Sequence, residues 1–174
     1  MTEAVTITRA TMADVPALVR LVNRAYRGEA SRQGWTTEAD LLTGDLRTDE
    51  ATLGLAMLEP AAVVLQAVAD GGELCGCVYL QKRGERLYLG MLAVAPEKQA
   101  SGIGKKLLVA AKQHARVWKC PAIFMTVISI RSELLAWYER HGFHDTGARE
   151  PMPVTPRFGV PTRPLEFAVL EKIL

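Results

Sequence analysis

Three extended, apolar runs follow one another in the middle of the sequence, over residues 61–69, 74–82 and 85–94. The segments between them are Asp70-Gly71-Gly72-Glu73 and Arg83-Gly84, whose residue types favour tight turns. Extended runs separated by such turns are typical of consecutive hairpins. We therefore predict an antiparallel meander at the centre of the fold.

Helices and strands alternate after this meander. Apolar side chains recur at helical spacing over residues 102–117, which predicts a long helix directly after the third run. Residues 122–128 are β-rich and apolar, as in a buried strand. Residues 132–140 show helical spacing again, and Gly142 is suited to end that helix.

The remaining elements are shorter. They are a strand over 5–7, a helix beginning at Thr11 or Asp14, a short helix over 37–44, a weakly amphipathic segment over 50–58, and a final strand pair over 143–147 and 165–170. With 174 residues the chain fits one domain, residues 1–174, of α+β class.

Composition excludes several classes of partner. The net charge is +2, and the Lys and Arg residues are scattered among Asp and Glu, so the basic stripe that nucleic acids require is missing. No run approaches the roughly 20 apolar residues that cross a bilayer. We expect a cytoplasmic protein that binds neither nucleic acid nor membrane.

The cysteines predict neither a disulfide framework nor a metal site. Cys75, Cys77 and Cys120 are odd in number, and Cys75 and Cys77 should point to one face of a strand. The histidines do not supply the spacing that zinc ligands need. We expect the three thiols to be packing residues.

The start of the long helix carries the strongest chemical signal, the motif Gln99-x-x-Gly102-x-Gly104. The first N–H groups of a helix lack partners and lie at its positive dipole end, so they suit a diphosphate. Glycines there let phosphate oxygens approach the backbone, and Lys105 and Lys106 add positive charge. The alternative is that the two glycines merely loosen the helix start.

Two other phosphate-binding motifs do not fit this segment. A Walker loop requires glycine where Gln99 stands and Ser or Thr where Lys106 stands. A dinucleotide-binding fingerprint requires a third glycine in place of Leu107, and a parallel sheet before it.

A strand, the Gln-x-x-Gly-x-Gly motif and a helix in this order resemble the GNAT superfamily of N-acetyltransferases. The similarity in element order covers nearly the whole chain, and it is specific over 89–108 and 132–143. It implies a mixed, mostly antiparallel central sheet flanked by helices and splayed between the fourth and fifth strands, with acetyl-CoA as cofactor. By resemblance the coenzyme contacts Met91, Leu92, Ala93 and Val94 of the fourth strand, and Gln99, Ala100, Ser101, Gly102, Ile103, Gly104 and Lys105 of the motif.

The segment Tyr138-Glu139-Arg140-His141-Gly142-Phe143 looks like the Y-x-x-x-G-F ending of that family. The resemblance makes Tyr138 the general acid that protonates the departing sulfur, in a direct transfer whose oxyanion is held by an N–H near Leu92. A packed core tyrosine is the alternative. Many relatives carry Asn where this chain has Arg131, whose guanidinium could replace the contact to the coenzyme or could be solvated.

The acceptor side is expected in the segment after the first helix. Tyr26 and Trp35 could form an aromatic wall, and Glu29 and Glu38 could attract an ammonium, although each could also be structural. Several relatives place a glutamate where this chain has Tyr88, so the base is Glu29, Glu38, Tyr88 or a water chain, and we favour Glu29.

The resemblance implies acetyl transfer to a primary amine of a small molecule or amino acid. A non-catalytic acetyl-CoA sensor, or an acetyltransferase acting on a protein lysine or N-terminus, are the alternatives. The proline-rich segment 151–164 could border the acceptor pocket or form a flexible insert. Edge strands make a homodimer possible.

Overall fold

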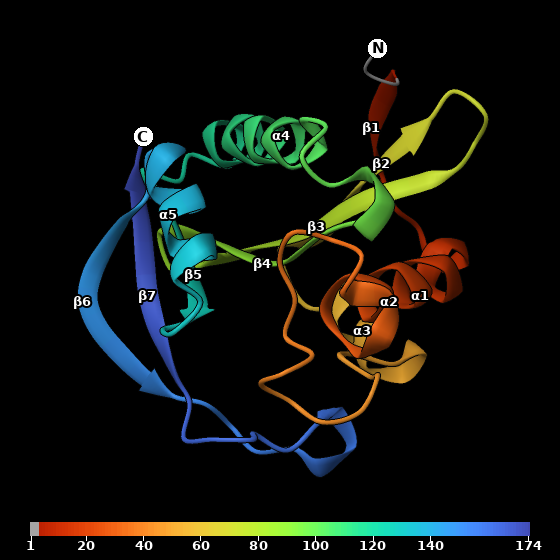
Figure 1. Ribbon diagram of the computed structural model, residues 1–174. Coiled ribbons are helices and arrows are strands. Elements are labelled where there is room, and N and C mark those ends of the chain that lie inside the picture. The colour runs from red at the N-terminus through yellow and green to blue at the C-terminus, as the bar shows by residue number, and fades with distance from the viewer. Residues whose placement is uncertain (1–3) are drawn as a thin grey trace.

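The computed structural model describes residues 4–174; Met1–Glu3, the first three positions of the expected domain 1–174, lie outside the described residues. Its framework is a seven-stranded sheet in the order β1-β2-β3-β4-β5-β7-β6, with helices on both faces (Figure 1). The sheet is antiparallel except where β4 meets β5. The predicted α+β class, with a mostly antiparallel mixed sheet, is confirmed.

The first half of the sheet is built by four strands. Short β1 (Val5–Arg9) pairs with β2 (Ala62–Ala69), and β3 (Leu74–Arg83) and β4 (Arg86–Val94) complete the meander. The predicted hairpins are confirmed, because the turns after Ala69 and Arg83 are as short as their residue types indicate.

The second half follows the long helix α4 (Ile103–Val117). Strand β5 (Ala122–Ile128) leads into α5 (Ser132–Arg140), and both have the predicted bounds. Antiparallel β7 (Glu166–Ile173) covers the outer edge of β5, and β6 (His144–Pro151) forms the exposed sheet edge.

Strands β4 and β5 separate soon after they meet. Their parallel ladder holds two residue pairs, Leu87 with Ile123 and Tyr88 with Phe124. Beyond Tyr88, β4 stays with β3 while β5 stays with β7. A β-bulge at Met91, which has a φ of +55°, also bends β4 there. The predicted splay is therefore confirmed.

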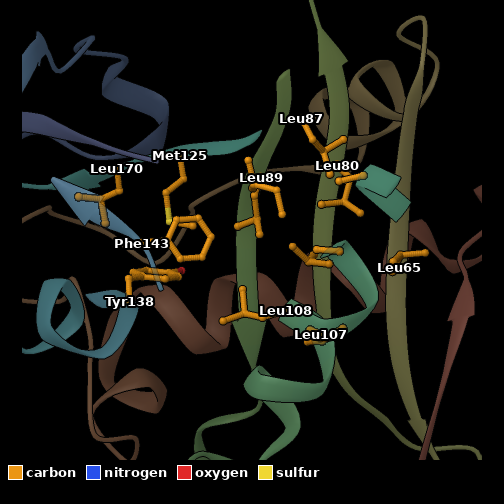
Figure 2. Close-up of a cluster of buried hydrophobic side chains, with 14 of the residues drawn as sticks. Leu65, Leu80, Leu87, Leu89, Leu107, Leu108, Met125, Tyr138, Phe143 and Leu170 are labelled. Atoms are coloured by element: carbon orange, nitrogen blue, oxygen red, sulfur yellow. The ribbon is translucent and has the colours of Figure 1, made fainter. Parts of the chain in front are cut away.

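Two apolar cores lie on opposite sheet faces. Helices α1 (Val15–Tyr26) and α3 (Glu50–Met57) cover one face, with Leu18 and Leu53 almost fully buried. Helix α4 covers the other face, where Figure 2 shows Leu107 and Leu108 directed at the strands. Tyr138 and Phe143 extend this second core toward Met125 and Leu170 of β5 and β7 (Figure 2).

The segment between α1 and α3 differs from the prediction. The helix expected over 37–44 is wrong: only a turn forms there, and a short helix, α2 (Gly28–Ser31), precedes it. The Glu38 amide donates to the Tyr26 carbonyl at 3.0 Å and Leu42 forms a β-bridge with Pro161, so tertiary contacts outweigh local helix propensity.

The two neighbouring cysteines also depart from expectation. Cys75 packs into the core under α4, whereas Cys77 packs into the core under α1, so they do not share a face. The pairing register of β2 with β3 shifts at this point, and one extra residue reverses the alternation of side chains. All three cysteines are buried. Among the described residues no helix is long and apolar enough to cross a bilayer.

Candidate active site

The start of α4 is a left-handed loop followed by an uncapped helix end. Ala100 and Gly102 have φ values of +63° and +89°, and Gly102 is the N-cap residue. No side chain caps this helix, so its first N–H groups face outward without an internal acceptor. The glycine is needed because a left-handed conformation costs other residues about 1–2 kcal/mol.

Gly104 allows α4 and α5 to come close together. A Cβ atom at Gly104 would lie 3.2 Å from the Trp137 ring, which is tighter than ordinary contact. Trp137 was not among the predicted site residues, although it directly precedes the Tyr138–Phe143 motif. A bulkier residue at 104 would therefore push on the indole and narrow the space between the two helices.

A cavity of about 440 Å³ opens at this point and is termed the first cavity. It is bordered by the end of β4, the start of α4 and α5. The predicted coenzyme residues that line it are Leu92, Ala93, Val94, Gln99, Ala100, Gly102, Ile103, Gly104, Lys105 and Arg131. All charged side chains in its described lining are basic, since Lys98 and Arg140 add to Lys105 and Arg131.

Two predicted coenzyme residues lie elsewhere. Met91 lines the neighbouring cavity described below. Ser101 lines neither cavity, and its hydroxyl donates a short hydrogen bond to the Lys98 carbonyl. Its side chain therefore holds the turn before α4 in shape.

The Gln99 side chain ties the motif to the acceptor-side loop. Its amide nitrogen donates to the Val94 carbonyl at 3.2 Å, and its amide oxygen accepts from the Trp35 N–H at 2.9 Å. A Cβ atom at Gly34 would lie 2.2 Å from that oxygen, so the loop approaches where only glycine fits. Gln99 thereby links β4, α4 and the segment around Trp35.

A second cavity, of about 310 Å³, adjoins the first and lies along the Tyr88–Leu92 part of β4. It is lined by the splayed ends of β4 and β5, the Tyr26–Arg47 segment and the β6–β7 connection. The two cavities share five residues, which form their common wall: Tyr26, Leu92, Arg131, Leu134 and Tyr138.

Tyr138 is held rigidly in this common wall. Its side chain is 5% exposed and its ring makes edge contacts with Trp137 and Phe143. Burial raises the pKa of Tyr138 well above the usual value, and the nearby Tyr26 adds to the effect. The raised pKa keeps the phenol protonated. Within residues 4–174 its hydroxyl makes no hydrogen bond, so it can donate one to a ligand.

Tyr26 fixes the backbone at the same place. Its hydroxyl donates to the Leu92 carbonyl at 2.7 Å. Burial raises the pKa of Tyr26 to about 12, with a smaller contribution from Glu38, while Arg47 and Arg131 oppose the shift. The Leu92 carbonyl is thus occupied by a phenol that remains protonated at any physiological pH.

A buried ion-pair network of Arg27, Glu38 and Arg131 lines the second cavity, and its Arg131 also lines the first. One oxygen of Glu38 accepts from the Arg27 Nε at 3.0 Å and the other accepts from Arg131 at 3.2 Å. All three side chains are almost fully buried. The expectation that Glu38 attracts an ammonium is corrected, because two guanidinium groups already occupy its carboxylate.

Two roles were considered for Arg131, a contact to the coenzyme and a solvated side chain, and the structure shows a third, in a buried ion-pair network. It is 5% exposed, so a solvated guanidinium is wrong, and it lines both cavities. Besides Glu38, it donates to the Thr36 hydroxyl. Its Nε has no hydrogen-bond acceptor, and the nearest carboxylate, Glu133, is 3.7 Å away.

The structure does not bring Glu29 to the site. Its carboxylate is 90% exposed, it pairs with Arg32 on the surface, and it lines neither cavity. The helix α2 carries it outward, which sequence alone does not reveal. The assignment of Glu29 as base and acceptor ligand is therefore corrected.

Tyr88 and Trp35 lie at different cavities. Tyr88 lines the second cavity, where its hydroxyl folds back over Gly90 and the Arg83 guanidinium lies 3.8 Å above its ring. Trp35 lines the first cavity and is 44% exposed, so it stands on the predicted coenzyme side and not in an acceptor wall.

Two functional candidates of the second cavity were not foreseen, Arg27 and Arg47. Neither belongs to a motif. The one signal for Arg27 is its position directly after Tyr26, because the helix end that places the phenol also turns the next side chain into the core.

The residues present fit acetyl-CoA. The basic first cavity, the uncapped α4 terminus and the close approach at Gly104 suit a diphosphate, and the gap between β4 and β5 suits an extended arm. Leu92 and Tyr138, where the cavities meet, would lie at its thioester end.

Comparisons with known proteins agree with this arrangement. The acetyltransferase (GNAT) family matches residues 17–143. A search of proteins with curated functions found no match. The fold is similar to ribosomal-protein-S18-alanine N-acetyltransferase of Escherichia coli, with 17% identity, 98% and 94% of the two chains covered and a TM-score of 0.72.

Two similar structures contain the coenzyme. YncA of Salmonella typhimurium, solved with its cofactor acetyl-CoA, is 20% identical over 98% of this chain and 94% of its own, with a TM-score of 0.70. The PaiA N-acetyltransferase of Thermoplasma acidophilum, in complex with coenzyme A, is 17% identical over 98% and 99%, with a TM-score of 0.68. The chain belongs to the acetyltransferase (GNAT) family, and its cofactor is acetyl-CoA.

Proposed function

We propose that this protein transfers an acetyl group directly from acetyl-CoA to the primary amine of a small molecule. One observation carries the proposal: a basic cavity and a second, separate cavity meet at a wall that contains Leu92 and a buried, protonated Tyr138. Two reactants entering from the two sides would meet there without a covalent enzyme intermediate. When bound, acetyl-CoA supplies the activated acetyl thioester.

The coenzyme side holds its ligand mostly through backbone. The first N–H groups of α4 and the side chains of Lys98 and Lys105 would hold the diphosphate. The strand end at Leu92–Val94 offers main-chain groups to the arm, because β5 no longer pairs with it. We assign the N–H near Leu92 to the developing negative charge on the acetyl oxygen.

Tyr138 is the proposed general acid. Its raised pKa keeps the phenol protonated, so that it can donate its hydrogen bond and proton to the departing sulfur. The rigid ring contacts with Trp137 and Phe143 hold the hydroxyl in one place. Tyr26 positions the adjacent strand by its bond to the Leu92 carbonyl.

The amine needs no strong base in this site. The second cavity contains more guanidinium groups than carboxylates, and positive surroundings lower the pKa of a bound ammonium. Tyr88 or water would accept the released proton, since Glu38 is committed to two arginines and Glu29 is on the surface.

A small acceptor fits better than a protein segment. The Thr43 N–H donates to the Val160 carbonyl at 3.1 Å, and the Thr162 N–H donates to the Leu41 carbonyl at 2.9 Å. These bonds join the loop before α3 to the β6–β7 connection, and Figure 1 shows the two segments side by side. Both line the second cavity, so the proline-rich segment is a pocket wall and not a free insert.

Steady-state release of free thiol from acetyl-CoA, measured with a panel of small primary amines, tests the proposal. Calorimetry with coenzyme A runs in parallel. Coenzyme binding with turnover of at least one amine is the expected result. Binding without turnover of any amine would instead support a non-catalytic sensor, and turnover of peptide N-termini alone would support a protein acetyltransferase.

A further inference from the structure

The second cavity has an excess of positive charge. Its charged lining, among the described residues, consists of Arg27, Glu38, Arg47 and Arg131. One carboxylate therefore faces three guanidinium groups. An uncompensated charge in a partly dehydrated site is unfavourable unless a ligand or partner neutralises it.

Two of these arginines are largely satisfied by the protein. Arg27 donates to Glu38, to the Leu46 carbonyl at 3.0 Å and to the Phe158 carbonyl. Arg131 donates to Glu38 and to the Thr36 hydroxyl, which leaves its buried Nε without an acceptor. Both arginines thus serve the wall of the cavity, since the Arg131 Nε faces the Glu133 carboxylate at 3.7 Å.

Arg47 is the arginine without a partner acid. Its guanidinium forms no ion pair or hydrogen bond among residues 4–174, and its one recorded contact is with the ring of Tyr26, 5.4 Å from the ring centroid. Its backbone is fixed, because the Arg47 N–H donates to the Asn23 side chain at 2.6 Å. A half-buried, anchored guanidinium over an aromatic ring is well placed to bind an anion.

The position of Arg47 relative to the common wall defines the shape of the ligand. The Arg47 guanidinium lies over the ring of Tyr26, and the hydroxyl of that ring donates to the Leu92 carbonyl. An anion at Arg47 would therefore lie beside the same tyrosine whose hydroxyl reaches the common wall, so one molecule can span both places. A short molecule that carries both groups fits a cavity of about 310 Å³.

We propose that the acceptor is an amino acid or a close analogue, whose anionic group binds Arg47 while its amine faces Leu92 and Tyr138. The inference rests on the proposed acetyl transfer and adds the class of acceptor. The excess positive charge favours such zwitterionic molecules and disfavours polyamines and other simple cations.

The test uses matched acceptors that differ in one charge, L-amino acids and their carboxamides, together with 2-aminoethylphosphonate and spermidine. For the wild-type protein we expect kcat/KM for the acids to exceed that for the amides by about ten- to a hundredfold, as a charge-assisted hydrogen bond allows. Acetylation of the phosphonate as well would show that the site recognises an anion in general. Higher kcat/KM for the amides or for spermidine would overturn the inference.

Variants connect the preference to Arg47. Arg47→Gln should raise KM for the acids about ten- to a hundredfold and leave the amides and coenzyme affinity unchanged, while Arg47→Lys should restore part of the preference. Arg20→Gln removes an exposed positive charge from α1 and serves as the control, with no change expected. Equal losses for acids and amides in Arg47→Gln would contradict the assignment.

The failure of this inference and that of the proposed function give different results. If neutral amines or polyamines are acetylated and acids are not, the acceptor class is wrong and the transferase function stands. If no amine in the panel is acetylated although coenzyme A binds in calorimetry, both proposals fall.

Discussion

The two cavities are constructed in opposite ways. Half of the lining of the first cavity comes from one continuous stretch, residues 92–105, which includes the uncapped start of α4; the rest comes from α1, the loop around Trp35 and α5. The second is formed by side chains from α1, the loop before α3, the two splayed strands and the β6–β7 connection. The difference teaches that the proposed coenzyme side depends more on local conformation, whereas the proposed acceptor side depends on long-range contacts.

The largest expected effect is loss of the buried ion-pair network. Glu38→Gln should lower the free energy of unfolding by about 3–5 kcal/mol, because it leaves two buried guanidinium groups without their carboxylate. Urea denaturation measures this, and calorimetry should show coenzyme A binding largely retained in the folded fraction. Asp40→Asn removes an exposed carboxylate that pairs with Arg32 and is the control, with an unchanged unfolding midpoint. Equal losses in the two variants would contradict a special role for the network.

The next effect concerns the common wall. Tyr138→Phe should lower kcat about a hundredfold while the dissociation constant of coenzyme A stays the same, since only the proton donor is removed and the ring remains. The matched control is Tyr79→Phe, which also deletes a buried hydroxyl. That hydroxyl donates to the Ala56 carbonyl at 3.0 Å, and Tyr79 lines neither cavity, so kcat should stay unchanged. Unchanged turnover in Tyr138→Phe would remove the acid from the mechanism.

A third prediction separates the two sides directly. Gly104→Val should weaken coenzyme A binding about tenfold or more, because the added atoms would press on Trp137 across the first cavity. The KM for the amine should hardly change. Gly71→Val, in a turn where nothing lies within 4 Å, is the matched control. A large rise in the amine KM with normal coenzyme affinity would reverse the assignment of the cavities.

The smallest effect is expected from pH. The pKa of Tyr26 is about 12 and that of Tyr138 is also raised, so both phenols keep their protons as the pH rises through the usual tyrosine range. We expect kcat/KM to rise as the amine loses its proton and then to stay within about twofold up to pH 10. A descending limb with a midpoint below pH 10 would show that another acid controls the reaction.

The strand, loop and helix that carry the Gln99 motif could be predicted from sequence because their signals lie in one continuous stretch. Gln99, Gly102 and Gly104 stand in one motif, and the strand before it and the helix after it have strong periodicity. The splay of the sheet was expected from the family resemblance and is confirmed by the two-pair ladder of β4 with β5. The motif residues needed no distant contact to be recognised.

The second cavity could not be predicted in the same way. Glu29 and Glu38 look alike in a polar stretch of sequence, yet one is exposed and the other is buried. Arg131, 93 residues away from Glu38, decides the difference together with Arg27. Turn formation in place of the helix over 37–44 has a similar origin, since the bridge from Leu42 to Pro161 joins segments far apart in the sequence.

The short ladder between β4 and β5 has a mechanical consequence. The two halves of the sheet, β1–β4 and β5–β7, are joined in backbone pairing by two residue pairs, Leu87 with Ile123 and Tyr88 with Phe124. A small rotation of one half against the other about these two pairs would widen or narrow the gap between β4 and β5 beside Tyr138, and the strand pairing within each half would stay intact. We therefore expect the ease of this rotation, more than the width of the gap between β4 and β5 at rest, to decide how bulky an acyl group the protein accepts.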